Sequence, residues 1–444
     1  MSIDRRGFLK AAGGAAAAWA GGIPAFGRQK PGQTDDAVVN QAEDRIRKCR
    51  MGTAALRLTG PNGQPLPSGA SLRISQTRHK FLFGCNIFKL GRCRTAEDNA
   101  AYEKQFAELL NYATLPFYWW QYEMQKGKPD DARTEEIARW CNARGIAMKG
   151  HPLAWNWAEP RWLAQSTPEE AMQLQFERIG RCTERFKGSI DIWDVVNEAT
   201  HYDRDEVKQR APRLTQAIAK LGIGEYVRTA FKIARKANPQ AVLVINDYRM
   251  DAAYADNVIS QLVDEAGKPL YDVIGLQSHM HGGYWGAARA WEVCERFAKF
   301  GKPLHFTETT VVSGPKKDSL WATTPEGEQL QAKQVAEFYT VLFSHPAVEA
   351  ITWWDFTDQN AWQRAPAGLV RDDMSPKPAY DQLRDLVKGK WWTKVETTAD
   401  SRGGADFQGF FGQYEVEAKL GDRRLTGGFS LDRDRKTPVE IRLA

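Results

Sequence analysis

The sequence has no long apolar run, little excess charge and no closely paired cysteines, and each absence removes a class of protein. No stretch reaches the roughly 20 apolar residues of a membrane-spanning helix, so we expect no membrane span in the mature chain. A formal net charge of +6 over 444 residues is too small for a nucleic-acid-binding surface. The six cysteines never occur as Cys-x-x-Cys, which argues against a zinc ribbon or a redox motif.

Aromatic residues, in contrast, are abundant. Sixteen Trp within an aromatic fraction of 11% are more than a hydrophobic core needs, and sugar rings stack on aromatic faces. Trp is also a common core residue, so composition alone leaves a sugar-binding role and a structural role equally open. With 42% hydrophobic residues, the chain can bury a large core and is long enough for one barrel-sized domain and a smaller one.

The N-terminus resembles a twin-arginine export signal. Asp4-Arg-Arg-Gly-Phe-Leu-Lys10 precedes an Ala/Gly-rich apolar run from Ala11 to Ile23. The alternative, a basic amphipathic helix, is disfavoured because the run contains four glycines. We therefore expect residues 1–27 to be a leader, and the mature protein to be exported already folded to the periplasm or the medium.

Between residues 80 and 390, short apolar segments alternate with helical segments, which is typical of parallel βα units. The clearest helix start is Thr167-Pro-Glu-Glu170, where a capping box coincides with Pro at the first helical position. Eight strands are enough to close a barrel, so the predicted fold class is α/β, a (β/α)8 TIM barrel with small β segments at both ends of the chain. The strands are expected at residues 81–88, 112–117, 147–155, 191–197, 242–248, 273–279, 304–309 and 350–356.

The two flanks of this region are expected to be small β structures. Residues 28–79 contain a linker and two alternating segments, at residues 55–58 and 71–75, separated by the turn-like Pro61-Asn-Gly-Gln-Pro65. We interpret this part as a β-hairpin. Residues 391–444 again show short strands divided by Gly-rich or Asp-rich turns, and are expected to form a small β module that packs with the hairpin.

In such a barrel the active site lies at the C-terminal ends of the strands. The segment Asp191–Ala199 ends in Asn197 and Glu198, and the segment Pro303–Thr310 presents Glu308. Two carboxyl groups at two strand ends suggest an acid and a nucleophile. A single polar residue at a strand end is more often a structural cap, but many together indicate a site. The other strand ends carry Asn86, His151, Trp155, Asn246, Asp247, Gln277, His279, His281, Trp353, Trp354, Asp355 and Asp358.

These segments resemble the family 10 glycoside hydrolases, the retaining endo-1,4-beta-xylanases. The resemblance covers roughly residues 80–390, and the Asp-Val-Val-Asn-Glu motif with a downstream Thr-Glu is its most specific part. It is carried, in order and spacing, by Trp193-Asp-Val-Val-Asn-Glu-Ala199, Gly275-Leu-Gln-Ser-His279, Thr307-Glu308, and Thr352-Trp-Trp-Asp-Phe-Thr-Asp358 with Trp362. It implies cleavage of a β-1,4-linked polysaccharide, xylan or a xylan-like plant glycan, without a cofactor or a metal.

The resemblance also implies residue roles, with Glu198 as acid/base and Glu308 as nucleophile. Chemistry supports that division, because a retaining glycosidase needs one protonated and one ionised carboxyl group. Trp and Val neighbours favour the neutral form of Glu198, whereas a hydrogen bond from His279 would keep Glu308 charged. Asn197 is placed to bind the sugar 2-hydroxyl. The expected substrate-binding residues are His151, Trp155, Asn197, Gln277, His279, Trp354 and Trp362.

Three departures from the family pattern leave the substrate open. Where the family has a Glu-Asn-Glu-Met-Lys-Trp motif that grips the sugar, this chain has residues 114–123 with Phe117-Tyr-Trp-Trp120, which offer stacking surface in place of charged contacts. Asn156 stands where xylanases commonly place a second His, and Asp355 replaces the usual Gly after Trp354. Asp355 either selects a hydroxyl pattern or a cationic decoration, or caps a helix. We expect weaker activity on plain xylan and a preference for a decorated or related β-linked glycan.

Two other classes remain as alternatives. A metal-dependent barrel hydrolase would use His151, His279, His281 and Asp247, but it leaves both glutamates without roles. A non-catalytic sugar-binding barrel would need neither glutamate. We therefore expect an enzyme that acts as a monomer on a polysaccharide or an oligosaccharide.

Overall fold

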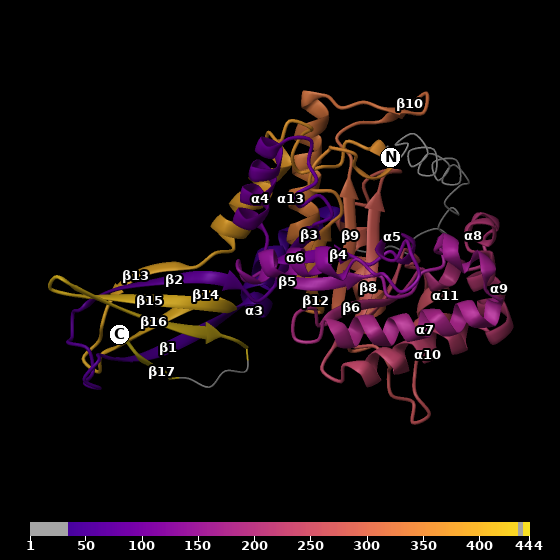
Figure 1. Cartoon of the computed structure of the whole chain (residues 1–444). Coiled ribbons are helices and arrows are strands. Elements are labelled where there is room, and N and C mark those ends of the chain that lie inside the picture. Colours follow the sequence, from indigo (N-terminus) through magenta and orange to yellow (C-terminus); the bar gives the residue numbers. More distant parts are fainter. Residues whose placement is uncertain (1–33, 434–437) are drawn as a thin grey trace.

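The computed structural model describes residues 34–433 and 438–444, and it contains a closed barrel of eight parallel strands. The expected (β/α)8 TIM barrel is confirmed, and each predicted strand is present. Figure 1 shows the arrows of β8 and β9 pointing towards the end of the barrel where the β10 hairpin lies. In barrel order the strands are β12 (Val348–Trp353), β3 (Leu82–Asn86), β4 (Tyr112–Pro116), β5 (Ala147–His151), β6 (Ile192–Asn197), β7 (Val242–Asp247), β8 (Val273–Met280) and β9 (Leu304–Val311).

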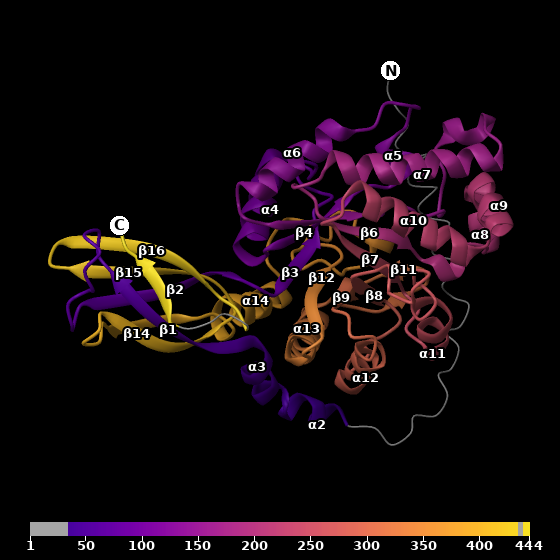
Figure 2. The same ribbon diagram turned by 90° about the horizontal axis from the view of Figure 1, so that it is seen from below.

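Helices surround the barrel, as the view in Figure 2 shows. The capping box at Thr167 is confirmed, because its side chain accepts from the backbone N–H of Glu170 while Glu170 accepts from that of Thr167. The longer helices are α4 (Ala96–Leu109), α6 (Asp131–Asn142), α7 (Pro168–Arg185), α9 (Pro212–Leu221), α10 (Ile223–Ala237), α12 (Ala287–Ala298), α13 (Pro325–Ser344) and α14 (Pro378–Asp385). Shorter elements are α5 (Trp119–Tyr122), α8 (Asp205–Arg210), α11 (Ala252–Tyr254), η3 (Arg161–Gln165), η4 (Ala199–His201), η5 (Ala255–Ile259), η6 (Trp362–Arg364), η7 (Leu386–Lys390), β10 (Lys316–Lys317) and β11 (Leu320–Trp321).

The two flanks form one β unit of two sheets with its own apolar core. The predicted hairpin is wrong, since β1 and β2 do not pair with each other. They are separated by 11 residues rather than a tight turn, and each pairs with strands from the C-terminal flank. One sheet has the order β14 (Gly404–Phe410), β1 (Met51–Thr59), β17 (Val439–Arg442), and the other β13 (Lys394–Thr398), β2 (Ser71–His79), β15 (Gly412–Leu420), β16 (Arg423–Leu431).

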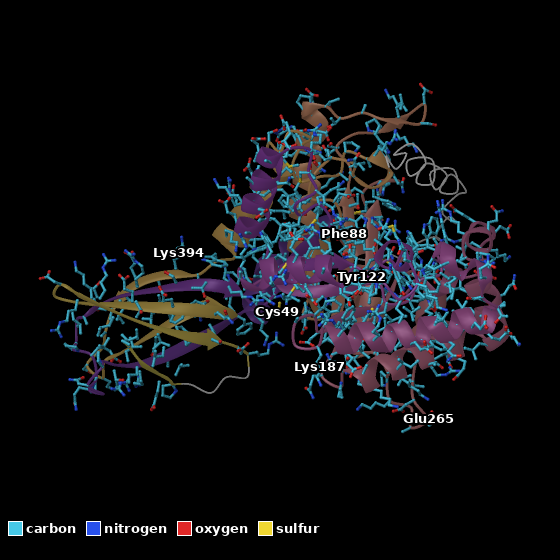
Figure 3. All side chains as sticks on the ribbon, in the orientation of Figure 1. Cys49, Phe88, Tyr122, Lys187, Glu265 and Lys394 are labelled. Carbon is cyan, nitrogen blue, oxygen red and sulfur yellow. The ribbon has the colours of Figure 1, made fainter. Side chains whose placement is uncertain are left out.

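This β unit joins the barrel at the end opposite the polar strand ends. Strand β2 runs almost directly into the start of β3, and Arg50 donates to the carbonyls of Phe343 and His345, which precede β12, and of Val348, the first residue of β12. Arg50 ends α3 (Ala42–Arg50), which follows α2 (Asp35–Asn40). Figures 1 and 2 both show the unit beside the barrel, and Figure 3 places Lys394 on it and Phe88 in the barrel.

No helix within the described ranges is both long and apolar enough to cross a membrane. All six cysteines are unpaired. The predicted leader, residues 1–27, lies outside the described residues.

Candidate active site

Two glutamates lie at the ends of β6 and β9. Glu198 follows the last residue of β6 in the left-handed region, with φ 54° and ψ 46°. Such a conformation costs a non-glycine residue about 1–2 kcal/mol, and strained residues of this kind cluster at functional sites. The backbone N–H of Glu198 donates to the carbonyl of Asn246 at 2.9 Å, which fixes the turn. Glu308 lies within β9 and its side chain is almost fully buried.

Three side-chain amides connect the two carboxyl groups. Gln277 Nε2 donates to Glu198 Oε1 at 3.4 Å and to Asn197 Oδ1 at 3.2 Å. Asn246 Nδ2 donates to the same Asn197 oxygen at 2.7 Å and to Glu308 Oε1 at 2.9 Å. These bonds occupy the oxygen of Asn197, so its Nδ2 group remains to donate to a ligand. The sequence placed four of these five residues at the site; Asn246 was recognised only as a strand end.

The surroundings push the two glutamates towards opposite protonation states. Burial, together with the negative charges of Asp247 and Glu308, raises the pKa of Glu198 to about 8, against smaller opposing effects of Arg204 and Gln277. Burial also acts to raise the pKa of Glu308, but the hydrogen bond from His279 and the positive charges of His151, His279 and Lys149 outweigh it and leave that pKa lowered. At neutral pH the site therefore holds one neutral and one ionised carboxyl group.

His279 contacts Glu308 as the sequence predicted. Its Nε2 lies 3.0 Å from Glu308 Oε2, and its Nδ1 lies 2.8 Å from Thr310 Oγ1. Its ring packs against Trp362 and Trp354, with centroids 4.4 and 5.8 Å apart. The Nε2–H donates to Glu308, and the contact of Nδ1 with the Thr310 hydroxyl holds the ring in this orientation.

His151 is held by two charged residues that the sequence analysis did not select. Its Nδ1 lies 2.7 Å from Asp194 Oδ2, and Lys149 Nζ lies at the same distance from that oxygen. All three side chains are buried. His151 Nε2 lies 3.9 Å from Glu308 Oε1, so Asp194 orients an imidazole that faces the predicted nucleophile. The sequence feature that could have identified them is a charged residue in the middle of a buried strand, Lys149 in β5 and Asp194 in β6.

An aromatic wall, made of Tyr118, Trp120, Trp155 and Trp157, adjoins His151. The Tyr118 ring lies 5.5 Å from that of His151 and 5.9 Å from that of Trp155, and Trp155 stacks on Trp157 at 5.6 Å. All four side chains are partly exposed.

The expectation that residues 117–120 all supply stacking surface needs correction. Phe117 is buried against Trp193, and Trp119 is buried with its Nε1–H donating to Glu123. Short helix α5 begins at Trp119, so neighbouring aromatic residues point in different directions. Only Tyr118 and Trp120 of this stretch belong to the wall.

The departures at Asp355 and Asn156 have structural partners. Asp355 Oδ2 accepts from the backbone N–H of Trp362, the first residue of η6, at 3.0 Å, and burial raises the pKa of Asp355 to about 7. This favours the capping interpretation of Asp355. Asn156 Nδ2 donates to the carbonyl of Tyr202 and to the hydroxyl of Thr215, and so ties its loop to the segment after η4 and to helix α9.

Arg204 is a site residue that the sequence did not indicate. Its Nη2 lies 3.5 Å from Glu198 Oε2, and its Nη1 donates to the hydroxyl of Tyr248 at 3.3 Å. It lies in the loop after η4, beyond any strand end, which is why strand periodicity could not identify it.

Three of the four residues considered for a metal, His151, His279 and Asp247, have other partners, whereas both ring nitrogens of His281 are buried without a hydrogen-bond partner in the described part of the chain. His279 contacts Glu308 and Thr310, and Asp247 accepts from Thr200 and Arg249. Within residues 34–433 and 438–444, no group of three or more His, Cys, Asp or Glu side chains has the geometry to hold a metal ion.

Known proteins with similar sequences include several xylanases. Endo-1,4-beta-xylanase B of Thermotoga neapolitana is 28% identical over 257 residues, which is 55% of this chain and 70% of that protein. Anti-sigma-I factor RsgI6 of Acetivibrio thermocellus is 25% identical over 386 residues, and endo-1,4-beta-xylanase 2 of Arabidopsis thaliana 24% over 406. The alignments cover 85% and 88% of this chain but only 46% and 34% of those two longer relatives.

Among solved structures, xylanase 10B of Thermotoga petrophila RKU-1 in complex with xylobiose aligns with a TM-score of 0.58 and 25% identity. The alignment covers 70% of this chain and 95% of that one. The family model described as Glycosyl hydrolase family 10 matches residues 76–386, which contain the barrel and both glutamates. This chain therefore belongs to glycosyl hydrolase family 10.

Proposed function

We propose that the protein is a retaining glycoside hydrolase that cleaves a β-1,4-linked xylan or xylan-like glycan by double displacement. The observation that carries the proposal is the opposite effect of the surroundings on two carboxyl groups. The pKa of Glu198 is raised to about 8 and that of Glu308 is lowered, while amides shared between them hold both in one site. A non-catalytic sugar-binding barrel would have no need of this arrangement.

In the first step, Glu198 donates its proton to the glycosidic oxygen while a carboxylate oxygen of Glu308 attacks the anomeric carbon. The bond to the leaving sugar breaks, and a covalent glycosyl-enzyme forms. In the second step, the now ionised Glu198 takes a proton from water, whose oxygen displaces Glu308 from the anomeric carbon. Two inversions give net retention, and both carboxyl groups return to their starting states.

The amides and the imidazoles support this chemistry. The free Nδ2 group of Asn197 donates to the sugar 2-hydroxyl, and the neutral Glu198 accepts from Gln277. His279 and Asn246 each hold one oxygen of Glu308 in place. Removing the contact to the 2-hydroxyl should lower kcat more than it weakens substrate binding, because this hydrogen bond strengthens in the transition state.

The substrate is proposed to be a decorated xylan or a related β-linked glycan. Tyr118 and Trp120 offer stacking surface, which discriminates sugars weakly, in place of the charged grip of the family. The test is a side-by-side assay of plain xylan, substituted xylans and other β-linked glycans. Highest kcat/KM on unsubstituted xylan would contradict the shifted specificity and leave the enzyme class standing. No turnover of any glycan would contradict the enzyme itself.

A metal-dependent hydrolase is tested in the same assay. The two-carboxylate mechanism predicts full activity after treatment with a strong chelator, whereas loss of activity that is restored by a divalent metal would favour the alternative. We also expect the protein to act as an exported monomer.

A further inference from the structure

Beside Glu198, Arg204 carries a charge that the surrounding residues balance poorly. Its Nε is buried and has no hydrogen-bond partner. Its Nη groups contact the Tyr248 hydroxyl and Glu198 Oε2, at 3.3 and 3.5 Å. Its guanidinium also lies over the rings of Trp157 and Tyr248, at 5.7 and 5.9 Å. Among the described residues, Glu198 is the one carboxyl group within ion-pairing distance of Arg204.

Glu198 cannot balance this charge while it acts as an acid. The raised pKa of Glu198, about 8, makes it neutral at neutral pH. Asp203 is exposed, so water screens its charge. Of the other carboxyl groups nearby, Asp205 pairs with Lys208, Glu206 with Arg210 and Asp251 with Arg249. Asp247, the last residue of β7, accepts from the neutral Thr200 hydroxyl and acts on Glu198, and it is not within ion-pairing distance of Arg204.

A second guanidinium and an aromatic surface extend the patch. Arg210 lies 4.5 Å from the centroid of Trp157, whose ring stacks on Trp155 of the aromatic wall. Burial, and to a smaller extent the charges of Arg204 and Arg249, lower the pKa of His201 to about 4, against the opposing charges of Asp203 and Asp251. We call Arg204, Arg210 and Trp157 the cationic patch.

The cationic patch contacts one oxygen of the acid. Glu198 Oε2 faces Arg204, whereas Oε1 faces Gln277, whose neighbour across the β8–β9 register is Glu308. Because the acid of a retaining glycosidase lies beside the bond that is cleaved, a group that contacts Glu198 is near the substrate.

We propose that the cationic patch binds a carboxylate of the substrate, so that the natural substrate is a β-1,4-glycan bearing uronic acid branches, with Arg204 as the specificity-determining residue. The inference rests on the proposed function and names its substrate class. A guanidinium binds a carboxylate through charge-assisted hydrogen bonds, and the Arg204 side chain keeps 31% of its surface exposed beside Glu198. A neutral sugar hydroxyl would accept a hydrogen bond there without balancing the charge.

The test compares three oligosaccharides that share one β-1,4-xylose backbone. The first carries a glucuronic acid branch, the second carries the same branch with its carboxyl group reduced to an alcohol, and the third is unbranched. The wild type should show a kcat/KM for the acidic compound roughly 10-fold or more above that for the reduced one, as expected for a charge-assisted hydrogen bond. Salt should reduce this ratio.

Substitutions at Arg204 test whether this residue causes the ratio of kcat/KM between the acidic and the reduced oligosaccharide. Arg204→Gln should bring the ratio close to one, and Arg204→Lys should restore part of it because Lys keeps the charge without the fork of donors. Any effect of Arg204→Gln on the acidity of Glu198 cancels, because both substrates use the same acid. The matched control is Lys208→Gln, which removes one positive charge from α8. In the wild type, Lys208 pairs with Asp205 and does not contact Glu198.

Two results would overturn the inference: a wild-type ratio near one, or a ratio that Arg204→Gln leaves unchanged. Failure of the proposed function has a different outcome, since none of the three oligosaccharides would then be cleaved.

Discussion

Asp247 and Glu198 lie at the ends of the neighbouring strands β7 and β6, and the negative charge of Asp247 raises the pKa of Glu198. Burial is the larger cause of that shift. Burial also raises the pKa of Asp247 itself, to about 6, against several hydrogen bonds from Thr200 and backbone N–H groups. Asp247 therefore ionises before Glu198 as the pH rises, and its charge helps Glu198 to keep its proton above neutral pH.

These shifts predict a bell-shaped pH dependence of kcat/KM. Glu308 must be ionised, so activity falls as the pH drops through its lowered pKa, below the ordinary value of 4.5. Glu198 must be protonated, so activity falls as the pH rises through about 8. Asp247→Asn removes one negative charge beside Glu198 and should move the basic limb to lower pH while the acidic limb stays in place. A basic limb that stays or moves upward in pH–rate profiles would contradict this coupling.

Removing the acid should have an effect that depends on the leaving group. Glu198→Ala should lower kcat/KM on a polysaccharide by roughly 10²–10⁴-fold, the usual contribution of general acid catalysis. An aryl glycoside whose leaving group needs no proton should retain its first step. Added azide should then speed turnover and give a glycosyl azide of retained configuration. Azide without effect, or an inverted azide product, would argue against Glu198 as the acid/base.

Single substitutions at the neighbouring aromatic residues 117–120 should affect either substrate binding or protein stability, depending on whether the residue belongs to the aromatic wall or is buried. Trp120→Ala and Tyr118→Ala remove parts of the aromatic wall, so they should raise KM with little change in unfolding free energy. Phe117→Ala should cost about 3–5 kcal/mol of stability, because it empties a buried site beside Trp193. Denaturant unfolding and steady-state kinetics on the four single variants, Trp119→Ala included, measure both quantities. Equal stability losses at Trp120 and Phe117 would contradict the division.

The sequence accounts well for the barrel and for the strand-end part of the site. Parallel strands have a strong local pattern, and their C-terminal ends must meet, so Glu198, Glu308, Gln277 and His279 could be grouped without a structure. The predicted hairpin was wrong because β1 and β2 pair with strands that lie more than 300 residues away in the chain. Strand pairing over that distance leaves no local signal.

The direction of individual side chains was the other feature that could not be predicted from the sequence. The four consecutive aromatic residues 117–120 look alike in sequence, yet the turn into α5 buries two of them and leaves the other two partly exposed. Arg204 contacts Glu198 only because η4 folds the chain back over the end of β6. Both depend on irregular backbone, for which composition and periodicity carry little information.

Export through the twin-arginine route is proposed from residues 4–23 alone. Replacing both Arg5 and Arg6 with Lys keeps the charge and should leave active, uncleaved precursor in the cytoplasm. Fractionation of cells followed by an activity assay measures this. Unchanged export of the double variant would show that the arginine pair is not the signal.

The central claim is that Glu308 forms a covalent bond to the sugar. An activated 2-fluoro xylobioside slows both steps but leaves the first one faster, so it should inactivate the enzyme with one sugar adduct per chain. Mass spectrometry of the digested protein should locate the adduct on Glu308, and Glu308→Gln should take up none. An adduct on another residue, or no adduct together with a product of inverted anomeric configuration, would contradict the account.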